Sequence, residues 1–457
     1  MAGLPRFSSV GIRCLQSLGY KGITQTMKTS KKSKLNSRRA ALDLLSAVLD
    51  KNHALDEAFA NDAGTAKLEP RDRAFVRNLV TTCIRRLGQI DGLITACLNS
   101  PLPKKARVAE HLLRLGVCQL VFLRTPPHAA VDTSVDLAQQ LDLGPYKKLI
   151  NAVLRRVDRE ALSMIRKQDE GKLNTPKWLW ASWQETYGDE VCRKIAAAHL
   201  HIAPLDISVK SDSKQWAEQF SAEMMTETTV RLKSSGDVTE LPGFDDGEWW
   251  VQDIAATVPV KLLGDIQGCH VIDLCAAPGG KTAQLINAGA TVTAVDRSKN
   301  RLKRLQDNLK RLTMKADVVT ADACDWRPET LADMVLLDAP CSATGTIRRH
   351  PDLGYLKKPE DVDKLAALQT RLIVAATEMV RSGGKIVYST CSLEPKECED
   401  QISGVDGLGL KVEKIDPQRI SAFSSTITPE GTFRSLPFHL QEQGGMDGFF
   451  AAILKKT

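Results

Sequence analysis

The segment Val271–Thr282, with the sequence VIDLCAAPGGKT, constrains the fold of this 457-residue chain more than any other stretch. Its first four residues are mostly apolar and predict a buried strand, and a helix is predicted from about Thr282. Gly279 and Gly280 between them can take positive φ angles, which lets backbone approach a ligand closely. The unpaired N–H groups at a helix start attract an electronegative group. A strand, tight loop and helix in this order bind a cofactor at the carboxyl end of a parallel strand.

Two classes of cofactor can use such a loop. The ending Gly280-Lys281-Thr282 is similar to a nucleoside-triphosphate loop, but that loop requires glycine at the position of Cys275. A nucleoside-containing cofactor instead needs an acidic residue at the end of the next strand, about 20 residues on, to hold its ribose. Asp296 ends the strand-like segment Ala290–Asp296 at this spacing, so we favour the nucleoside-containing cofactor.

Residues 251–457 alternate between predicted strands and helices. Strands are predicted at residues 271–274, 292–295, 317–320, 334–337, 385–389 and 448–454, with helices such as 299–312 and 362–380 between them. This alternation predicts a Rossmann-like α/β domain, a doubly wound and mostly parallel sheet with helices on both faces.

Residues 36–165 carry a helical pattern. Leu44, Leu45 and Val48 share one face, and turns at proline and glycine separate the segments, so we predict an all-α domain. Its basic residues include Arg71, Arg73, Arg77, Arg85, Arg86, Lys104, Lys105, Arg107, Lys147, Lys148, Arg155 and Arg156. Any one of them is more simply a solvated charge, but so many in one domain favour a surface that faces RNA.

Residues 166–250 predict a small α/β connector. Trp178, Trp180 and Trp183 lie at spacings that suit one helical face, and we expect them in a core rather than stacked on nucleic acid. Residues 205–210 alternate as a strand does.

Residues 1–35 form a predicted basic, disordered leader, because the first 42 residues contain nine Lys or Arg and no Asp or Glu. An RNA-binding arm and an organelle transit peptide are alternatives, and a start at Met27 instead of Met1 stays open.

Eleven cysteines without a C-x-x-C pair argue against a disulfide framework and a zinc cluster, and for a reducing compartment. No apolar run approaches the ~18 residues that a membrane helix needs. We therefore expect a cytoplasmic monomer without a metal or a membrane, or an organellar protein if the leader is a transit peptide.

Two further strand ends carry reactive residues. The apolar strand 334–337 leads into Asp338 and Cys341, and the strand 385–389 leads into Cys391. Ligands of an open α/β sheet lie beyond the carboxyl ends of its strands, so these residues are expected on one edge, together with Asp273, Asp296 and Asp322. A lone cysteine after a strand is usually inert packing, but two of them beside a cofactor loop are a less ordinary set.

Such a set can alkylate a pyrimidine at C5, which is a poor carbon nucleophile. A thiolate that adds to C6 makes C5 enamine-like and able to attack an electrophilic methyl group. The reaction also needs a carboxyl group near N3, a base for the C5 proton and a nucleotide unstacked into the site. Asp338 and the two cysteines suit these roles.

These motifs resemble the RsmB/Nop/Sun family of S-adenosylmethionine-dependent RNA cytosine-C5 methyltransferases. The resemblance covers most of the chain and is carried by the segments Asp273–Thr282, Leu337–Gly345, Arg348–Asp352 and Thr390–Ser392. It implies that Cys391 is the nucleophile, that Cys341 assists release of the adduct, and that Asp338 holds the base near the methyl donor.

The same resemblance implies the cofactor site. Its residues would be Cys275, Ala276, Ala277, Pro278, Gly279, Gly280 and Lys281 around the methionine part of S-adenosylmethionine, Asp296 at the ribose, Asp322 beside the adenine, and Asp338.

Three N-terminal segments resemble the NusB-type RNA-binding domain, namely Pro70–Phe75, Pro126–Ala130 and Leu149–Arg155. This domain points to the RsmB branch, whose substrate is 16S ribosomal RNA. Four alternatives stay open: a tRNA cytosine methyltransferase, a non-catalytic RNA-binding assembly factor, a phosphate-loop ATPase, and a DNA cytosine methyltransferase with Cys341 as nucleophile.

Overall fold

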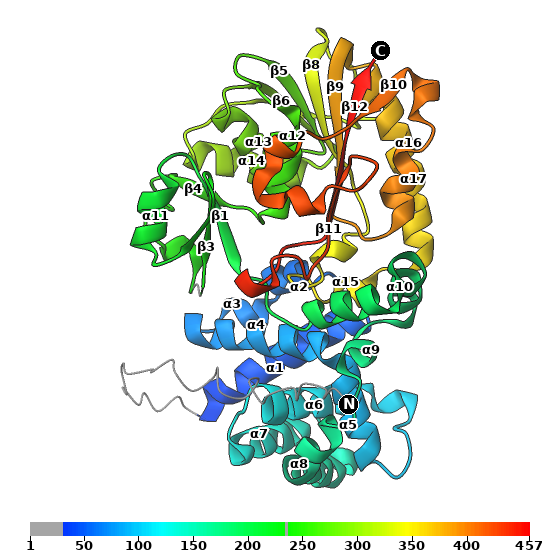
Figure 1. Ribbon diagram of the computed structural model, residues 1–457. Helices are drawn as coiled ribbons and strands as arrows, with labels where there is room; N and C mark the ends of the chain where they lie inside the picture. Colours follow the sequence, from blue (N-terminus) through cyan, green and yellow to red (C-terminus); the bar gives the residue numbers. More distant parts are fainter. Residues whose placement is uncertain (1–30, 234–235) are drawn as a thin grey trace, which may run out of the picture.

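The computed structural model describes residues 31–233 and 236–457 of the chain. Residues 1–30 of the predicted leader lie outside the described residues, and helix α1 begins at Lys31. From there the chain forms a helical part, a small sheet and a large sheet in that order (Figure 1).

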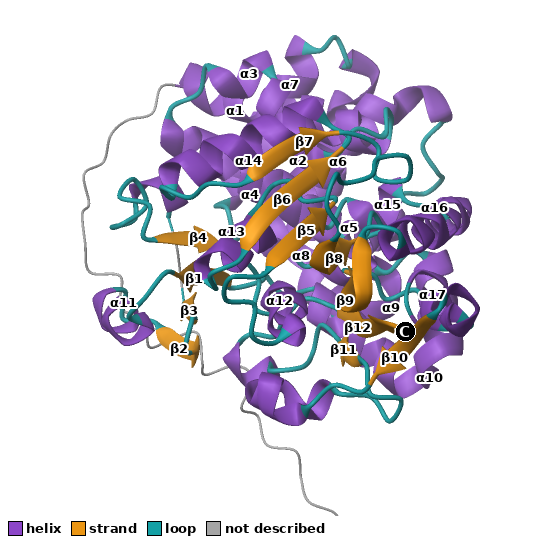
Figure 2. Cartoon of the chain, turned by 90° about the horizontal axis from the view of Figure 1, so that it is seen from above, coloured by secondary structure: helices purple, strands orange, loops and turns teal. Residues whose placement is uncertain are grey.

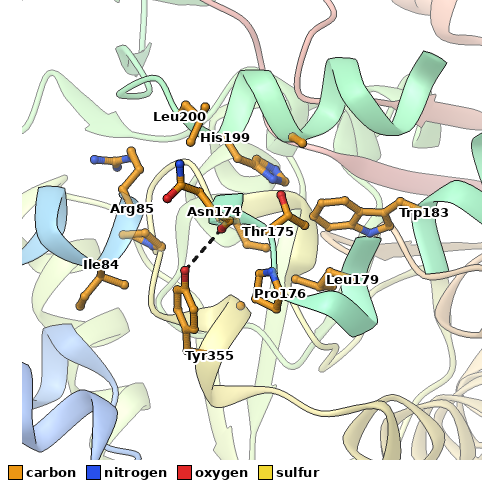
Figure 3. Close-up of a pocket in the computed structure, with 14 residues that line it drawn as sticks. Ile84, Arg85, Asn174, Thr175, Pro176, Leu179, Trp183, His199, Leu200 and Tyr355 are labelled. Carbon is orange, nitrogen blue, oxygen red and sulfur yellow. Dashed lines mark hydrogen bonds between the residues drawn. The ribbon is translucent and has the colours of Figure 1, made fainter. Parts of the chain in front are cut away.

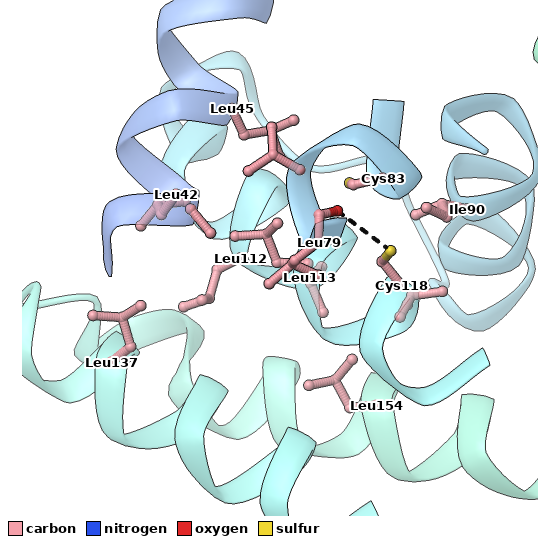
Figure 4. Packing of buried hydrophobic residues seen from close by; sticks show 14 of the residues in the cluster. Leu42, Leu45, Leu79, Cys83, Ile90, Leu112, Leu113, Cys118, Leu137 and Leu154 are labelled. Carbon is pink, nitrogen blue, oxygen red and sulfur yellow. Dashed lines mark hydrogen bonds between the residues drawn. The ribbon is translucent and has the colours of Figure 1, made fainter. Parts of the chain in front are cut away.

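The helical part packs around one apolar core, as the all-α prediction requires. Its helices are α1 (Lys31–Leu49), α2 (Leu55–Asn61), α3 (Ala63–Ala66), α4 (Pro70–Arg85), α5 (Leu87–Cys97), α6 (Arg107–Val117), α7 (Pro127–Gln140) and α8 (Gly144–Ile165). Leu45, Leu79 and Leu154 are fully buried in this core (Figure 4). The Cys118 thiol donates a hydrogen bond to the Leu79 carbonyl at 3.7 Å. Apolar side chains one helical turn apart thus form the faces that bury one another.

The small sheet follows two more helices, α9 (Glu170–Asn174) and α10 (Lys177–His199). Its antiparallel strands have the order β2-β3-β1-β4, with β1 (Leu205–Val209), β2 (Glu223–Thr226), β3 (Thr229–Leu232) and β4 (Trp249–Val251); α11 (Ser213–Gln219) joins β1 to β2. Trp180 and Trp183 are buried, and they share a core with Ile347 and Leu393 of the large domain. The two tryptophans are therefore core residues, and α10 packs with the large domain.

The large sheet has the order β10-β12-β9-β8-β5-β6-β7, with β11 paired to β12. Its strands are β5 (His270–Leu274), β6 (Thr291–Asp296), β7 (Asp317–Thr320), β8 (Ala332–Asp338), β9 (Val380–Thr390), β10 (Leu410–Glu413), β11 (Phe433–Ser435) and β12 (Phe449–Lys456). The five strands from β5 to β9 pair in parallel, whereas β12 pairs antiparallel with β9, β10 and β11.

Helices cover both faces of this sheet. One face carries α12 (Val258–Leu263), α13 (Gly280–Asn287) and α14 (Lys299–Arg311), and the other carries α16 (Pro359–Thr377) and α17 (Glu399–Ile402) (Figures 1 and 2). The predicted Rossmann-like fold is confirmed. Among the described residues, no helix combines the length and the apolar composition needed to cross a membrane.

Some predicted bounds are wrong. The helix predicted to reach Val380 ends at Thr377, because Val380 is already the first residue of β9, which pairs with Ala332 of β8 before a register shift. The short strands β10 and β11 escaped prediction, since four and three residues are too few to show an alternating pattern.

The helical part is docked on the large domain through the loop after β8. Tyr355 and Leu356, which belong to α15 (Leu353–Leu356), pack against the core of the helical part. The Asp352 carboxylate accepts a hydrogen bond from the Leu55 backbone N–H at 2.8 Å. These contacts fix the helical part against the sheet that carries the reactive residues.

Replacing Leu113 by alanine should destabilise the helical part by about 2–5 kcal/mol, because the fully buried side chain would leave a cavity. The matched control is Leu162→Ala, since Leu162 is 78% exposed and should change stability by less than about 0.5 kcal/mol. Urea unfolding followed by circular dichroism measures both. Equal transition midpoints for the two variants would contradict this account of the core.

Candidate active site

The two reactive cysteines follow the ends of neighbouring parallel strands. Asp338, the last residue of β8, is the register partner of Ser389 in β9, so the turns after both strands begin side by side. Cys341 and Cys391 lie in these turns, and their sulfur atoms are 3.5 Å apart. The strand pairing thus brings two thiols that are distant in sequence into hydrogen-bonding contact.

The contact between the thiols sets the protonation of one of them. The hydrogen bond with Cys391, followed by burial, raises the pKa of the Cys341 thiol well above its usual value. Cys341 is therefore a protonated thiol at neutral pH.

The buried carboxylate of Glu397 connects the two turns that hold the cysteines. Glu397 is fully buried, and it accepts hydrogen bonds from the Ser342 backbone N–H at 2.8 Å and from the Ser392 hydroxyl at 2.5 Å. The Ser342 hydroxyl also donates to it, and the two hydroxyl oxygens are 3.1 Å apart. Each serine directly follows one of the cysteines, so this network holds the spacing of the thiols. Burial raises the pKa of the Glu397 carboxyl, an effect that these hydrogen bonds oppose.

Glu397 was missed in the sequence. The sequence offered only a weak hint, an acidic residue six positions after Cys391. The segment is rich in serine and threonine, and it contains no cofactor motif. Because the carboxylate acts through serines on two separate turns, only the fold brings its role into view.

Asp338 lies beside the cofactor loop. Its carboxylate accepts a hydrogen bond from Lys281 Nζ at 2.8 Å and one from the Ser389 hydroxyl at 3.2 Å. Lys281 Nζ also lies 4.9 Å from the centre of the Phe449 ring. A lysine held in this way is not free to bind the phosphates of a nucleoside triphosphate, which disfavours the phosphate-loop alternative.

The cofactor loop turns sharply between β5 and α13. Gly279 has a φ of 101°, and a Cβ there would lie 2.9 Å from the Leu305 side chain, so only glycine suits the position. Cys275 also has a positive φ, 62°, although it is not glycine. This is the position at which a phosphate loop requires glycine, so the backbone makes a similar turn with a different residue.

A cavity beyond the ends of β5 and β6 brings together some of the predicted cofactor residues. Its lining is formed by Cys275, Val295, Asp296, Arg297, Arg301, Asp322, Ala323, Pro340, Leu368 and Leu372. The other predicted cofactor residues, Ala276, Ala277, Pro278, Gly279, Gly280, Lys281 and Asp338, are not part of this lining. Asp296 accepts backbone N–H groups from Ser298 at 2.9 Å and Ala277 at 3.3 Å, which fixes its carboxylate at the edge of the cavity.

The donors and acceptors of this region suit S-adenosylmethionine. Asp296 offers a carboxylate for ribose hydroxyl groups, Asp322 offers one beside the base, and Leu368, Leu372 and Pro340 offer apolar walls for that flat base. Oδ2 of the buried Asp273 accepts the Thr282 hydroxyl at 2.7 Å, whereas its Oδ1 has no hydrogen-bond partner. Burial raises the pKa of Asp273 to about 7, an effect that the Thr282 hydrogen bond opposes.

The fold and the site together define a methyltransferase with a Rossmann-like catalytic domain and a helical N-terminal domain. The sequence model of the 16S rRNA methyltransferase RsmB/F family matches residues 260–455, and that of the NusB family matches residues 35–159. The ribosomal RNA small subunit methyltransferase B of Vibrio cholerae is 34% identical over 440 residues, which are 92% of this chain and 98% of the relative. That of Cronobacter sakazakii is 34% identical over 443 residues, 93% of this chain and all of the relative. The chain belongs to this family of 16S rRNA methyltransferases, which confirms the predicted resemblance and enzyme class.

Two solved structures have a similar fold. The protein PH0851 is similar over 92% of this chain and 99% of its own, with a TM-score of 0.69 and 23% identity. NSun6 from Pyrococcus horikoshii, solved with SFG, is similar over 62% of this chain and 98% of its own, with a TM-score of 0.53 and 23% identity. At this identity the likeness concerns the fold.

Replacing Glu397 by alanine should slow methyl transfer by roughly 10- to 100-fold, because the two thiols would lose the carboxylate that fixes their spacing. Binding of S-adenosylmethionine should stay unchanged, since Glu397 is not part of the cofactor cavity. A second readout is the rate at which mild oxidation joins Cys341 to Cys391, which should fall in the variant.

The matched control is Glu378→Gln, because Glu378 is an exposed glutamate paired with Arg327 and touches neither cysteine turn. Wild-type rates of both oxidation and methyl transfer in Glu397→Ala would rule out the positioning role.

Proposed function

We propose that the protein methylates C5 of a cytosine in small-subunit ribosomal RNA, through a covalent bond between Cys391 and C6 of the base. The observation that carries the proposal is the pair of sulfur atoms 3.5 Å apart beside Asp338. The names of its relatives support the choice of substrate.

The first step belongs to Cys391. Its sulfur adds as a thiolate to C6 of a cytosine that has been unstacked into the site, and the electrons of the C5–C6 double bond then make C5 nucleophilic. Asp338, oriented by Lys281 and Ser389, passes the proton of the Cys391 thiol to N3 and holds the base through this proton, so that no negative charge builds up on the ring. S-adenosylmethionine, held by Asp296, Asp322 and the loop Cys275–Lys281, supplies an electrophilic methyl group when bound.

The last step belongs to Cys341. The proton on C5 has to leave before the double bond forms again and the C6–sulfur bond breaks. Cys341, in contact with Cys391, gives its thiol proton to the departing Cys391 sulfur as the C6–sulfur bond breaks, and the Cys341 thiolate formed in this way takes the C5 proton. The raised pKa of Cys341 makes this thiolate a strong base. One proton is released for each methyl group transferred.

The remaining features predicted from the sequence belong to the same proposal: domains at residues 36–165, 166–250 and 251–457, a monomeric state and a cytoplasmic location. RNA held by the helical domain is the proposed partner.

A calorimetric titration that detects no binding of S-adenosylmethionine would favour the alternative of a non-catalytic assembly factor.

Bisulfite sequencing of total RNA from cells with and without the gene tests the substrate directly. One cytosine of the small-subunit ribosomal RNA should lose its protection from conversion when the gene is deleted. A lost signal in tRNA instead would establish the tRNA alternative.

Substitution of each cysteine separates their roles. Cys391→Ala should abolish methyl transfer, because no sulfur remains to activate C5. Cys341→Ala should form the adduct but slow its release by roughly 10²- to 10⁴-fold, so that denaturing gels show protein joined to RNA.

The reverse pattern would contradict the assignment. A Cys391→Ala protein that traps RNA, with a Cys341→Ala protein that does nothing, would make Cys341 the nucleophile, as in the DNA methyltransferase alternative.

A further inference from the structure

Two buried arginines lie in contact at the junction of the helical part and the large domain. Arg85, the last residue of α4, is 8% exposed, and Arg348, in the loop after β8, is 2% exposed. Both line a crevice of about 690 Å³ between α4, the turn before β1 and the loop after β8.

Neither guanidinium has a full set of partners. Arg85 donates from Nη2 to the Arg348 carbonyl at 2.6 Å, but its Nε donates to nothing. Arg348 donates from Nη1 to the Gly444 carbonyl at 2.6 Å, its Nη2 lies 3.6 Å from Asp447 Oδ1, and its Nε donates to nothing. The buried Nε atoms of both arginines are thus unsatisfied at one place, which is uncommon in a folded protein.

The charge of Arg85 is also uncompensated, whereas Arg348 forms an ion pair with Asp447. No carboxylate in the described part of the chain forms an ion pair with Arg85. Burial, followed by the charges of Arg86 and Arg348, lowers the pKa of Arg85 to about 10, so it stays cationic at neutral pH. The Asp447 carboxylate lies 3.6 Å from Arg348 but binds Arg349 more closely, at 2.9 Å.

The other charged groups of the crevice do not supply the missing anion. Asp56 is paired with Arg77 at 2.6 Å and with His350 at 3.2 Å, and the Asp352 carboxylate accepts the Leu55 N–H. An adjoining pocket, lined by Arg85 and His199, adds no acidic group (Figure 3). Burial lowers the pKa of His199 to about 3, so this histidine is neutral. A purely structural role leaves the buried cation of Arg85 beside Arg348 unexplained, because isolated buried charges are strongly unfavourable.

We propose that Arg85 and Arg348 bind a backbone phosphate of the RNA strand that carries the target cytosine. A phosphate offers three or more acceptor oxygens and the missing negative charge, and guanidinium forks suit its geometry. Arg77, Lys233 and Arg349 also line the crevice, so its cations outnumber its carboxylates.

The position of Arg348 links this site to the reaction. Arg348 lies in the same loop as Cys341. Between these two residues, Gly345 donates its N–H to the Cys391 carbonyl at 3.0 Å. An RNA strand bound at Arg348 is therefore held at a fixed position relative to both cysteine turns. The inference rests on the proposed function for the identity of the nucleic acid, but the anion site itself depends only on the two arginines.

The test is the salt dependence of RNA binding, measured without S-adenosylmethionine by filter binding of an unmodified small-subunit ribosomal RNA transcript. Arg85→Gln should bind about 10- to 100-fold more weakly at low salt, because a charge-assisted hydrogen bond is lost. Its plot of log affinity against log salt should be less steep by roughly 0.7–0.9, the share of one phosphate contact. Arg85→Lys, which keeps the charge and is the safer variant for folding, should retain the wild-type slope.

The matched control is Arg159→Gln, which removes the same charge from an exposed position of the same helical part and should retain wild-type affinity. A second arm uses inorganic phosphate against chloride at equal ionic strength. Phosphate should raise the thermal midpoint of the wild type by about 1–3 °C and leave that of Arg85→Gln unchanged.

Equal affinity and slope for Arg85→Gln and wild type would overturn the proposal. If phosphate stabilised only the wild type while RNA binding stayed equal, the site would bind a free anion, which also overturns it. A wild type that binds RNA with the expected slopes but transfers no methyl group would refute the proposed function alone.

Discussion

The parallel pairing of β8 with β9 is the constraint on which the site depends. It aligns Asp338 with Ser389, so that the turns after both strands begin at the same edge of the sheet. Fifty residues separate Cys341 from Cys391 in sequence, and this register leaves their sulfurs 3.5 Å apart. A shift by one residue would turn each side chain to the other face of its strand, and the thiols would no longer meet.

The register of β8 and β9 does not by itself fix the distance between the two cysteine turns, because the backbone hydrogen bonds between the strands end where the turns begin. Glu397 continues the connection by accepting hydrogen bonds from Ser342 in one turn and Ser392 in the other. A buried carboxylate is unfavourable unless its oxygens are satisfied, and here they accept several donors. The energy of burying this charge is thereby linked to the distance between the thiols, since separating the turns would leave the carboxylate without partners.

The fold and the grouping of the two cysteines at one edge of the sheet could be predicted from the sequence, whereas the contacts that hold this edge could not. The cofactor loop, Asp296 and the two cysteines stand at the ends of long apolar strands, where periodicity and spacing give strong patterns. Glu397 has no such pattern, because its importance arises from burial and from partners far away in the chain. Arg348 stands in the recognised segment Arg348–Asp352, but the sequence did not show that it is buried. Arg85 was recognised only as one basic residue among many, since a sequence does not distinguish a solvated arginine from a buried one. The strands β10 and β11, which pair with β12, were missed for a different reason, because four and three residues are too few to show an alternating pattern.

The continuous segment after β8, from Cys341 to Tyr355, contributes residues to three different places in the structure. Cys341 lies at the catalytic edge, Arg348 lies in the crevice beside α4, and Tyr355 packs against the core of the helical part. Close packing transmits displacement, so a shift of the helical part would act on the Cys341 turn through this stretch. Gly345 marks the tightest point, because a Cβ there would lie 2.0 Å from the Gly448 carbonyl oxygen of the segment leading into β12. The helical domain is therefore part of the frame that positions the thiols, and this explains why it is docked through buried polar contacts.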